Sequence, residues 1–179
     1  MRKLLLVVGM VSLTFTVAWA ADRIFTNPKP DAHLKKLFPK AVAFSPLQGT
    51  PLHFEAFDVD PKANPSAKPI GYAFWTTDLA PNERGYHAAI HFLVGLDLKG
   101  VITGVALDYD SEPYGYFSIE PPEFVAQFTG KSIREPFRLG QDVDAVSRAT
   151  ITMTSAVRAI RDSSRTMARQ FLDPAAVKP

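Results

Sequence analysis

The chain has 179 residues, of which 46% are hydrophobic, and it contains no cysteine. The missing cysteine excludes disulfides, thiolate metal sites and iron–sulfur ligation by this chain, so any redox chemistry requires an added cofactor. The 20 basic and 18 acidic residues nearly balance, which makes nucleic acid an unexpected partner.

The N-terminus has the three parts of a secretory signal peptide. Residues 1–3 carry two basic side chains, residues 4–17 are mostly apolar, and residues 18–20 place alanines at a small-x-small cleavage site. We predict cleavage after Ala20, which leaves residues 21–179 as a single domain exported to the periplasm. An uncleaved membrane anchor is the alternative, although a span needs about 20 apolar residues.

The first half of the remaining chain alternates short elements with proline-rich connections. Asp31 is placed to cap a short helix that ends before Pro39. Residues 53–59 predict a strand, residues 61–69 a loop and the aromatic residues 70–77 a second strand.

The middle of the chain predicts a β-hairpin. In residues 90–96, Ile, Phe, Val and Leu side chains alternate onto one face, and residues 101–109 supply the returning strand. The sequence Asp97-Leu-Lys-Gly100 between them is a turn signal. Residues 111–117 then predict a loop.

The C-terminal part predicts two helices. Pro121 and Pro122 favour the start of one and Gly130 its end. The last helix is predicted by an apolar stripe at helical spacing, formed by Val157, Ile160, Ser164, Met167 and Phe171. The resulting fold class is α+β, with a twisted, mostly antiparallel sheet flanked by helices.

A second face of that last helix carries Arg158, Arg161, Arg165 and Arg169. Residues 131–179 hold nine Lys or Arg against five Asp or Glu, a basic excess that suits phosphate, an acidic partner or anionic lipid. Ordinary solvated helix surface is the alternative.

The segment before the last helix is the best candidate for chemistry. Residues 144–152 are dense in hydroxyls, and Thr152 or Thr154 is placed to cap the helix. A helix start also favours a phosphate group, so a phosphate site is the alternative. His87 and His91 lack further ligands nearby for a metal.

The sequence Asp144-Ala-Val-Ser-Arg-Ala-Thr150 resembles the flavinylation motif Asp-x-x-Ser/Thr-Gly-Ala-Thr of FMN-binding domains. Such domains occur in the G subunit of Rnf complexes and the C subunit of the sodium-pumping NADH:quinone oxidoreductase. The resemblance is closest to the extracytoplasmic N-terminal domain of NosR-type proteins. It spans roughly residues 71–156 and includes the stretches 71–81, 93–104 and 124–130.

This resemblance implies a role for each motif residue. Thr150 is the residue that takes FMN in phosphoester linkage, and Ala149 precedes it as in the motif. Asp144 and Ser147 correspond to the positions that an FMN transferase reads, the aspartate through the metal that binds its FAD donor.

Two departures from the family pattern bear on the flavin. Arg148 stands where the motif has glycine, and it either hinders a close backbone turn or pairs with the flavin phosphate. Glu112 and Pro113 correspond to the family's Glu-Pro loop near the flavin. The family's histidine stretch before that loop is replaced here by residues 108–111.

The resemblance implies covalent FMN and electron transfer outside the cytoplasm, by an electron-transfer protein or subunit rather than a stand-alone enzyme. An FMN transferase and a membrane or periplasmic redox partner are the implied partners. A non-redox accessory or sensory module that has lost flavin is the alternative. No catalytic residue or metal ligand is assigned.

Overall fold

The computed structural model describes residues 30–175 and 177. Over that range, five strands form one sheet in the order β1-β2-β3-β4-β5, with every neighbouring pair antiparallel. The strands are β1 (Ala43–Phe44), β2 (Phe54–Phe57), β3 (Gly71–Trp75), β4 (His91–Asp97) and β5 (Ile102–Tyr109). The helices are α1 (Asp31–Leu37), α2 (Thr76–Leu79), α3 (Gly115–Ser118), α4 (Pro122–Ala126) and α5 (Thr150–Phe171). The predicted α+β class with an antiparallel sheet is confirmed.

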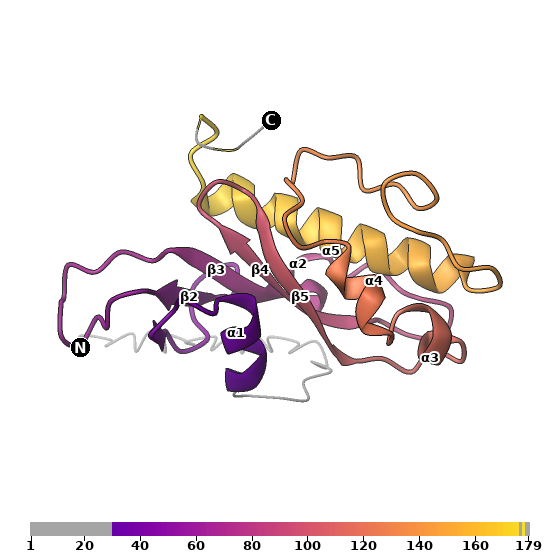
Figure 1. Ribbon diagram of the computed structural model, residues 1–179, viewed down its shortest axis with the longest axis horizontal. Coiled ribbons are helices and arrows are strands. Elements are labelled where there is room, and N and C mark those ends of the chain that lie inside the picture. Colours follow the sequence, from indigo (N-terminus) through magenta and orange to yellow (C-terminus); the bar gives the residue numbers. More distant parts are fainter. Residues whose placement is uncertain (1–29, 176, 178–179) are drawn as a thin grey trace, which may run out of the picture.

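The sheet lies between α1 on one face and the long helix α5 on the other (Figure 1). The alternation in β4 divides its side chains between the two layers, as the sequence predicts. Phe92, Val94 and Leu96 join the cluster that includes buried residues of α5. Leu93 joins the cluster formed with α1. Both faces of β4 are therefore buried, which fits its near-continuous apolar sequence.

The β4–β5 turn follows the predicted turn chemistry. The Asp97 Oδ1 atom accepts hydrogen bonds from the backbone N–H groups of Lys99 and Val101, each at 2.8 Å. Gly100 has a φ of 72°, which glycine adopts without the steric penalty of a Cβ atom. The predicted hairpin is confirmed.

Helix α5 packs the predicted stripe onto the sheet. Val157, Ile160, Ser164 and Met167 are buried, and the 22-residue helix is about 33 Å long. Phe171, at its C-terminal end, is half-buried.

The predicted helix caps are wrong. The N-cap of α1 is Pro30 and that of α5 is Ala149, and neither helix start has a side-chain cap among the described residues. Helix α5 begins at Thr150, so Thr152 lies inside its first turn, where its hydroxyl bonds to Glu112 instead.

Three short elements also differ from the prediction. The strand predicted over residues 70–77 ends at Trp75, where α2 begins, and the Thr76 hydroxyl bonds to the Ile90 carbonyl and the Phe92 N–H. The predicted loop 111–117 contains the start of α3, and the two-residue β1 was not predicted.

The predicted signal peptide, residues 1–20, lies outside the described residues. Among those that are described, no helix combines the length and apolar character needed to cross a membrane.

Candidate functional site

A buried carboxylate ties together three segments at the N-terminal end of α5. The side chain of Glu112 accepts hydrogen bonds from the backbone N–H groups of Tyr86, His87 and Ala88, at 2.8, 2.9 and 3.1 Å. The Thr152 hydroxyl donates a further bond to the same carboxylate. The residue Glu112 is 6% exposed, so these four donors replace the water that it loses on folding. The loop at 86–88, the loop at 112 and the first turn of α5 are thereby held together.

Gly85 allows the first loop to close around the carboxylate. A Cβ atom added at this position would lie 2.5 Å from Glu112 Oε1, which is too close for both atoms to keep their positions. The Gly85 N–H also donates to the Ala88 carbonyl at 2.7 Å, which closes the turn. A residue with a side chain would force the loop and the carboxylate apart.

The hydrogen bonds keep Glu112 ionised. Burial raises the pKa of this carboxyl, but the bonds from Thr152 and from the backbone of residues 86–88 outweigh it and leave the pKa lower than usual. The carboxylate is therefore negative at neutral pH, directly beside the first turn of α5.

A surface pocket of about 290 Å³ lies over this first turn. The residues that line it are Tyr86, Tyr114, Arg148, Ala149, Thr150, Ile151 and Thr152. Thr150 is exposed at the helix start. The first N–H groups of a helix have no partner within the helix and favour an anion. We call this hollow the acceptor pocket.

The structure unites some of the predicted site residues and separates others. Arg148, Ala149 and Thr150 line the acceptor pocket, and Glu112 reaches it through Thr152. Asp144, Ser147 and Pro113 are not among the described residues that line it. Asp144 and Ser147 are exposed on the segment leading to the pocket, where the Asp144 N–H donates to Gln127 Oε1 at 2.7 Å.

Sequence reasoning missed three large side chains of the acceptor pocket. Tyr86, Tyr114 and Ile151 are 65, 46 and 59% exposed. The available signal was an aromatic residue directly after Gly85 and another directly after Pro113. Such exposed rings suit a planar ligand.

The Arg148 backbone has a φ of 72°, a conformation that favours glycine. The turn before α5 thus has the backbone that a glycine would adopt, although arginine occupies the position. The arginine side chain is compatible with the turn and lies exposed at the pocket wall.

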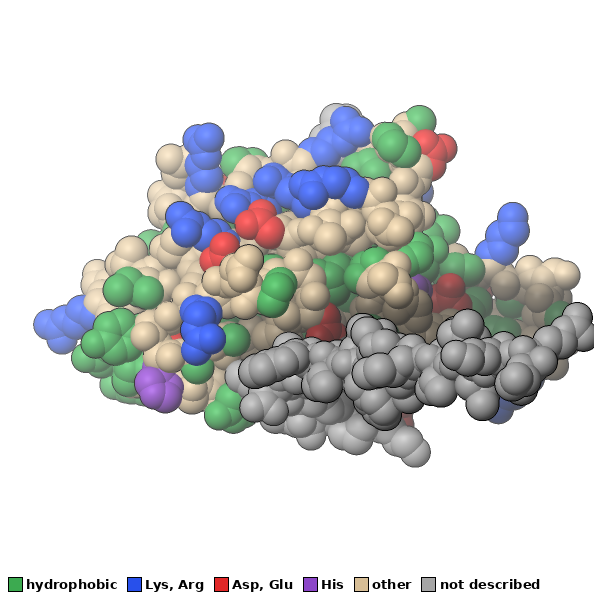
Figure 2. Space-filling view, turned by 180° about the vertical axis from the view of Figure 1, so that it is seen from behind, with side chains coloured by type: hydrophobic (Ala, Val, Ile, Leu, Met, Phe, Trp, Pro, Cys, Tyr) green, Lys and Arg blue, Asp and Glu red, His purple; other side chains and the backbone are tan. Residues whose placement is uncertain are grey.

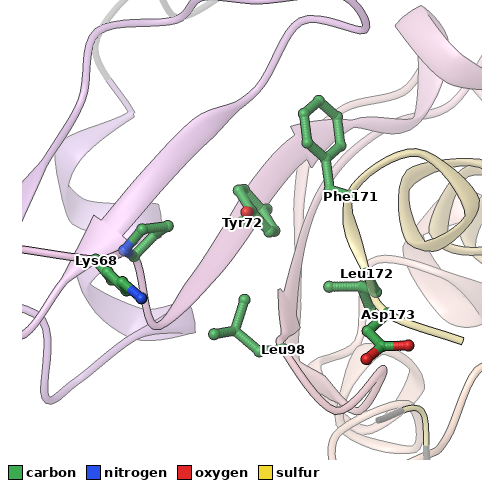
Figure 3. Close-up of a pocket in the computed structure, with 7 residues that line it drawn as sticks. Lys68, Tyr72, Leu98, Phe171, Leu172 and Asp173 are labelled. Atoms are coloured by element: carbon green, nitrogen blue, oxygen red, sulfur yellow. The ribbon is translucent and has the colours of Figure 1, made fainter. Parts of the chain in front are cut away.

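The opposite end of α5 carries a second pocket of about 370 Å³ (Figure 3). Its rings are Tyr72 and Phe171, with centroids 5.2 Å apart, and both contact the ring of buried His53. Figure 3 shows Lys68 on one side and Asp173 on the other. We call this hollow the ring pocket. Burial, together with the charge of Glu55, raises the pKa of Tyr72.

A buried histidine lies on the α1 side of the sheet. His91 is 4.4 Å from the stacked ring of Trp75, and its Nδ1 atom lies 2.7 Å from the Thr77 hydroxyl. The carboxylate of Asp108 lies 4.0 Å from His91 Nε2 and 3.6 Å from His33 Nε2. Burial lowers the pKa of His91, partly opposed by Asp108 and Asp78. His91 is thus separated from His87, which lies 3.0 Å from Ser111 Oγ beside the Glu112 loop.

Metal ligands are sparse in the described part of the chain. No group of three or more His, Cys, Asp or Glu side chains there is arranged to hold a metal ion.

The four arginines on α5 do not form one free cationic face. Arg165 donates to the carbonyl groups of Ile133 and Glu135, at 2.9 and 2.8 Å. Arg161 makes two bonds to Asp162. Arg158 and Arg169 remain exposed. Figure 2 shows Lys and Arg side chains spread over the upper part of the molecule, where Figure 1 places α5.

Comparison with known families gives a match for the segment that contains this helix start. Residues 85–164 match the family model of the FMN-binding domain. These residues belong to the FMN-binding domain family. The match contains Gly85, Glu112 and the whole lining of the acceptor pocket. No curated protein matches the chain.

The acceptor pocket fits the FMN of this family. Two exposed tyrosine rings suit the apolar isoalloxazine, while the helix start and the Arg148 guanidinium suit the phosphate. Residues 85–164 thus combine a match to the FMN-binding domain with a pocket that Thr150 lines.

Proposed function

We propose that this chain is an exported flavoprotein that carries FMN in phosphoester linkage to Thr150 and transfers electrons outside the cytoplasm. The observation that carries the proposal is the position of Thr150. Thr150 is exposed at the start of α5 and lines a pocket that falls within the family match. A plain helix cap would instead turn a hydroxyl toward the backbone, and α5 has no such cap among the described residues.

The attachment requires a second protein, an FMN transferase with FAD as donor. The bond between Thr150 Oγ and the FMN phosphorus forms while the pyrophosphate bond of FAD breaks. AMP leaves with the bridging oxygen, and the proton of the threonine hydroxyl is released. Asp144 and Ser147 are exposed before the turn, so an enzyme has access to both.

When bound, FMN supplies one- and two-electron chemistry. The chain's own part is to hold the cofactor: the Glu112 bonds fix the loop that carries Tyr86, and the turn at Arg148 sets the direction of Thr150. A covalent bond retains the cofactor where free FMN is scarce. The proposed electron partner is a membrane or periplasmic redox protein, as for the NosR-type domains that the sequence resembles.

The test is to produce the chain with its own N-terminus together with an FMN transferase. The exported protein is expected to stay yellow after denaturation and to gain the mass of FMN less one water, on the peptide that contains Thr150. An N-terminus at Ala21 is expected for the exported form. A folded, exported protein that gains neither colour nor mass would instead support the accessory module without flavin.

A further inference from the structure

Arg148 has a distinctive place in the acceptor pocket. Among the described residues that line it, Arg148 is the one with a formally charged side chain. It lies two residues before Thr150 in the same turn, and its side chain is exposed. The arginine side chain is therefore exposed in the same pocket that Thr150 lines.

The negative charge of Glu112 lies close to the pocket that Arg148 lines. Glu112 stays ionised, and its carboxylate is bonded to Thr152, which lines the pocket floor. A phosphate ester on Thr150 would add a second negative charge close to the first. Like charges repel, so the phosphate needs a compensating cation on its solvent side.

We propose that Arg148 is a positioning residue that pairs with the phosphate of the flavin and offsets the negative charge of Glu112 beneath it. The inference rests on the proposed attachment at Thr150. It gives a function to the residue that replaces the motif glycine, because a guanidinium binds two phosphate oxygens at once, whereas glycine offers only its backbone N–H. The backbone of the turn permits both residues, since φ at this position is already 72°.

The first test needs no flavin. Apo protein is titrated with inorganic phosphate at constant ionic strength while the backbone amide signals of Thr150 and Ile151 are followed by NMR. Arg148→Gln is expected to weaken phosphate binding about 3- to 10-fold, the range for one partly exposed charge-assisted contact. Arg148→Lys is expected to bind phosphate more tightly than Arg148→Gln. The control Arg158→Gln, about two turns into α5, is expected to bind phosphate as wild type does.

The comparison of FMN with riboflavin sharpens this test. Riboflavin lacks the phosphate, so Arg148→Gln is expected to reduce the affinity for FMN and leave that for riboflavin unchanged. The difference in FMN affinity between wild type and Arg148→Gln is expected to shrink with added salt, because the Debye length falls to about 3 Å at 1 M. Equal phosphate binding by wild type and Arg148→Gln would overturn the inference, as would equal losses for both flavins.

The loaded protein separates this inference from the proposed function. If wild type takes covalent flavin and Arg148→Gln takes it with the same phosphorus NMR signal, the pairing is wrong while attachment at Thr150 stands. If wild type takes no flavin, the attachment is wrong, and the inference that rests on it falls with it. A shifted phosphorus signal in Arg148→Gln, restored toward wild type in Arg148→Lys, supports both.

Discussion

Helix α5 has a pocket at each end. The two pockets have similar volumes, but different interactions hold the surrounding residues in place. The acceptor pocket, about 290 Å³, is organised by hydrogen bonds that converge on one buried carboxylate. The ring pocket, about 370 Å³, is organised by the tilted and edge-to-face ring contacts among His53, Tyr72 and Phe171. Converging hydrogen bonds fix the directions of the groups that they join, whereas ring packing fixes the volume that the side chains fill.

The family match separates the two ends in the same way. Residues 85–164 include every residue of the acceptor pocket, whereas of the residues lining the ring pocket only Leu98 falls inside that range. The family match therefore covers the pocket at the N-terminal end of α5 and leaves most of the pocket at its C-terminal end outside. Substitutions at the two ends should have effects of different kinds.

The largest expected effect comes from Glu112→Ala. It leaves three backbone N–H groups and the Thr152 hydroxyl without their acceptor, which should cost about 3 kcal/mol of unfolding free energy in urea. Amide hydrogen exchange should rise at residues 86–88 and at the start of α5. The exposed Glu120→Ala serves as the control. Faster amide exchange at the ring pocket in Glu112→Ala would instead show that the two ends of α5 are not independent.

Phe171→Ala should act at the other end. The loss of a half-buried ring that contacts His53 and Tyr72 should cost roughly 2 kcal/mol. The yield of covalent flavin should stay at the wild-type value, measured by mass, because Thr150 lies about 32 Å away along α5. A loss of flavin with the fold intact would show that the ring pocket takes part in the chemistry.

Arg148→Gly should stabilise the apo protein by about 0.5–1 kcal/mol. Glycine adopts the φ of 72° without steric penalty, although its greater freedom in the unfolded chain offsets part of the gain. The matched control is Arg158→Gly inside α5, which should destabilise by about 1 kcal/mol. Thermal unfolding of the two variants should therefore move in opposite directions. A destabilised Arg148→Gly would mean that the arginine side chain supports the fold.

The smallest effect is the pH dependence that Glu112 contributes. Its pKa is lowered in the folded state, so its stabilisation is present above the ordinary glutamate pKa of about 4.3 and is lost as pH falls through the folded value. Protonation removes the charge but leaves an accepting oxygen, so the loss should be smaller than in Glu112→Ala. Urea unfolding between pH 3 and 6 should show a shallower acid decline for Glu112→Gln, and an unchanged slope would contradict the assignment.

The sequence was sufficient to predict the elements whose pattern is local. The alternation in β4, the Asp97–Gly100 turn and the stripe on α5 each follow from the period of one element, and each is confirmed. Helix α2 and strand β1 span four and two residues, and they depend on contacts with the rest of the sheet. Elements this short contain too few residues to show a periodic pattern of apolar side chains.

The site was only partly predictable for a related reason. Arg148, Ala149 and Thr150 are consecutive in the motif and line one pocket, and the family resemblance pointed to Glu112 as well. The bond between Glu112 and Thr152 joins residues that are 40 positions apart, so Thr152 was taken for a cap from its local sequence. Tyr86 was missed because its role depends on the loop that closes around the same carboxylate.

The most direct test of the central claim compares two substitutions of Thr150 in protein produced with an FMN transferase. Thr150→Ser keeps a hydroxyl and should gain the mass of FMN less one water, as wild type does. Thr150→Ala has no oxygen for the phosphoester and should show neither the mass nor the yellow colour after denaturation, while its circular dichroism stays that of the folded protein. Covalent flavin that persists in Thr150→Ala would contradict the account and move the attachment to another residue.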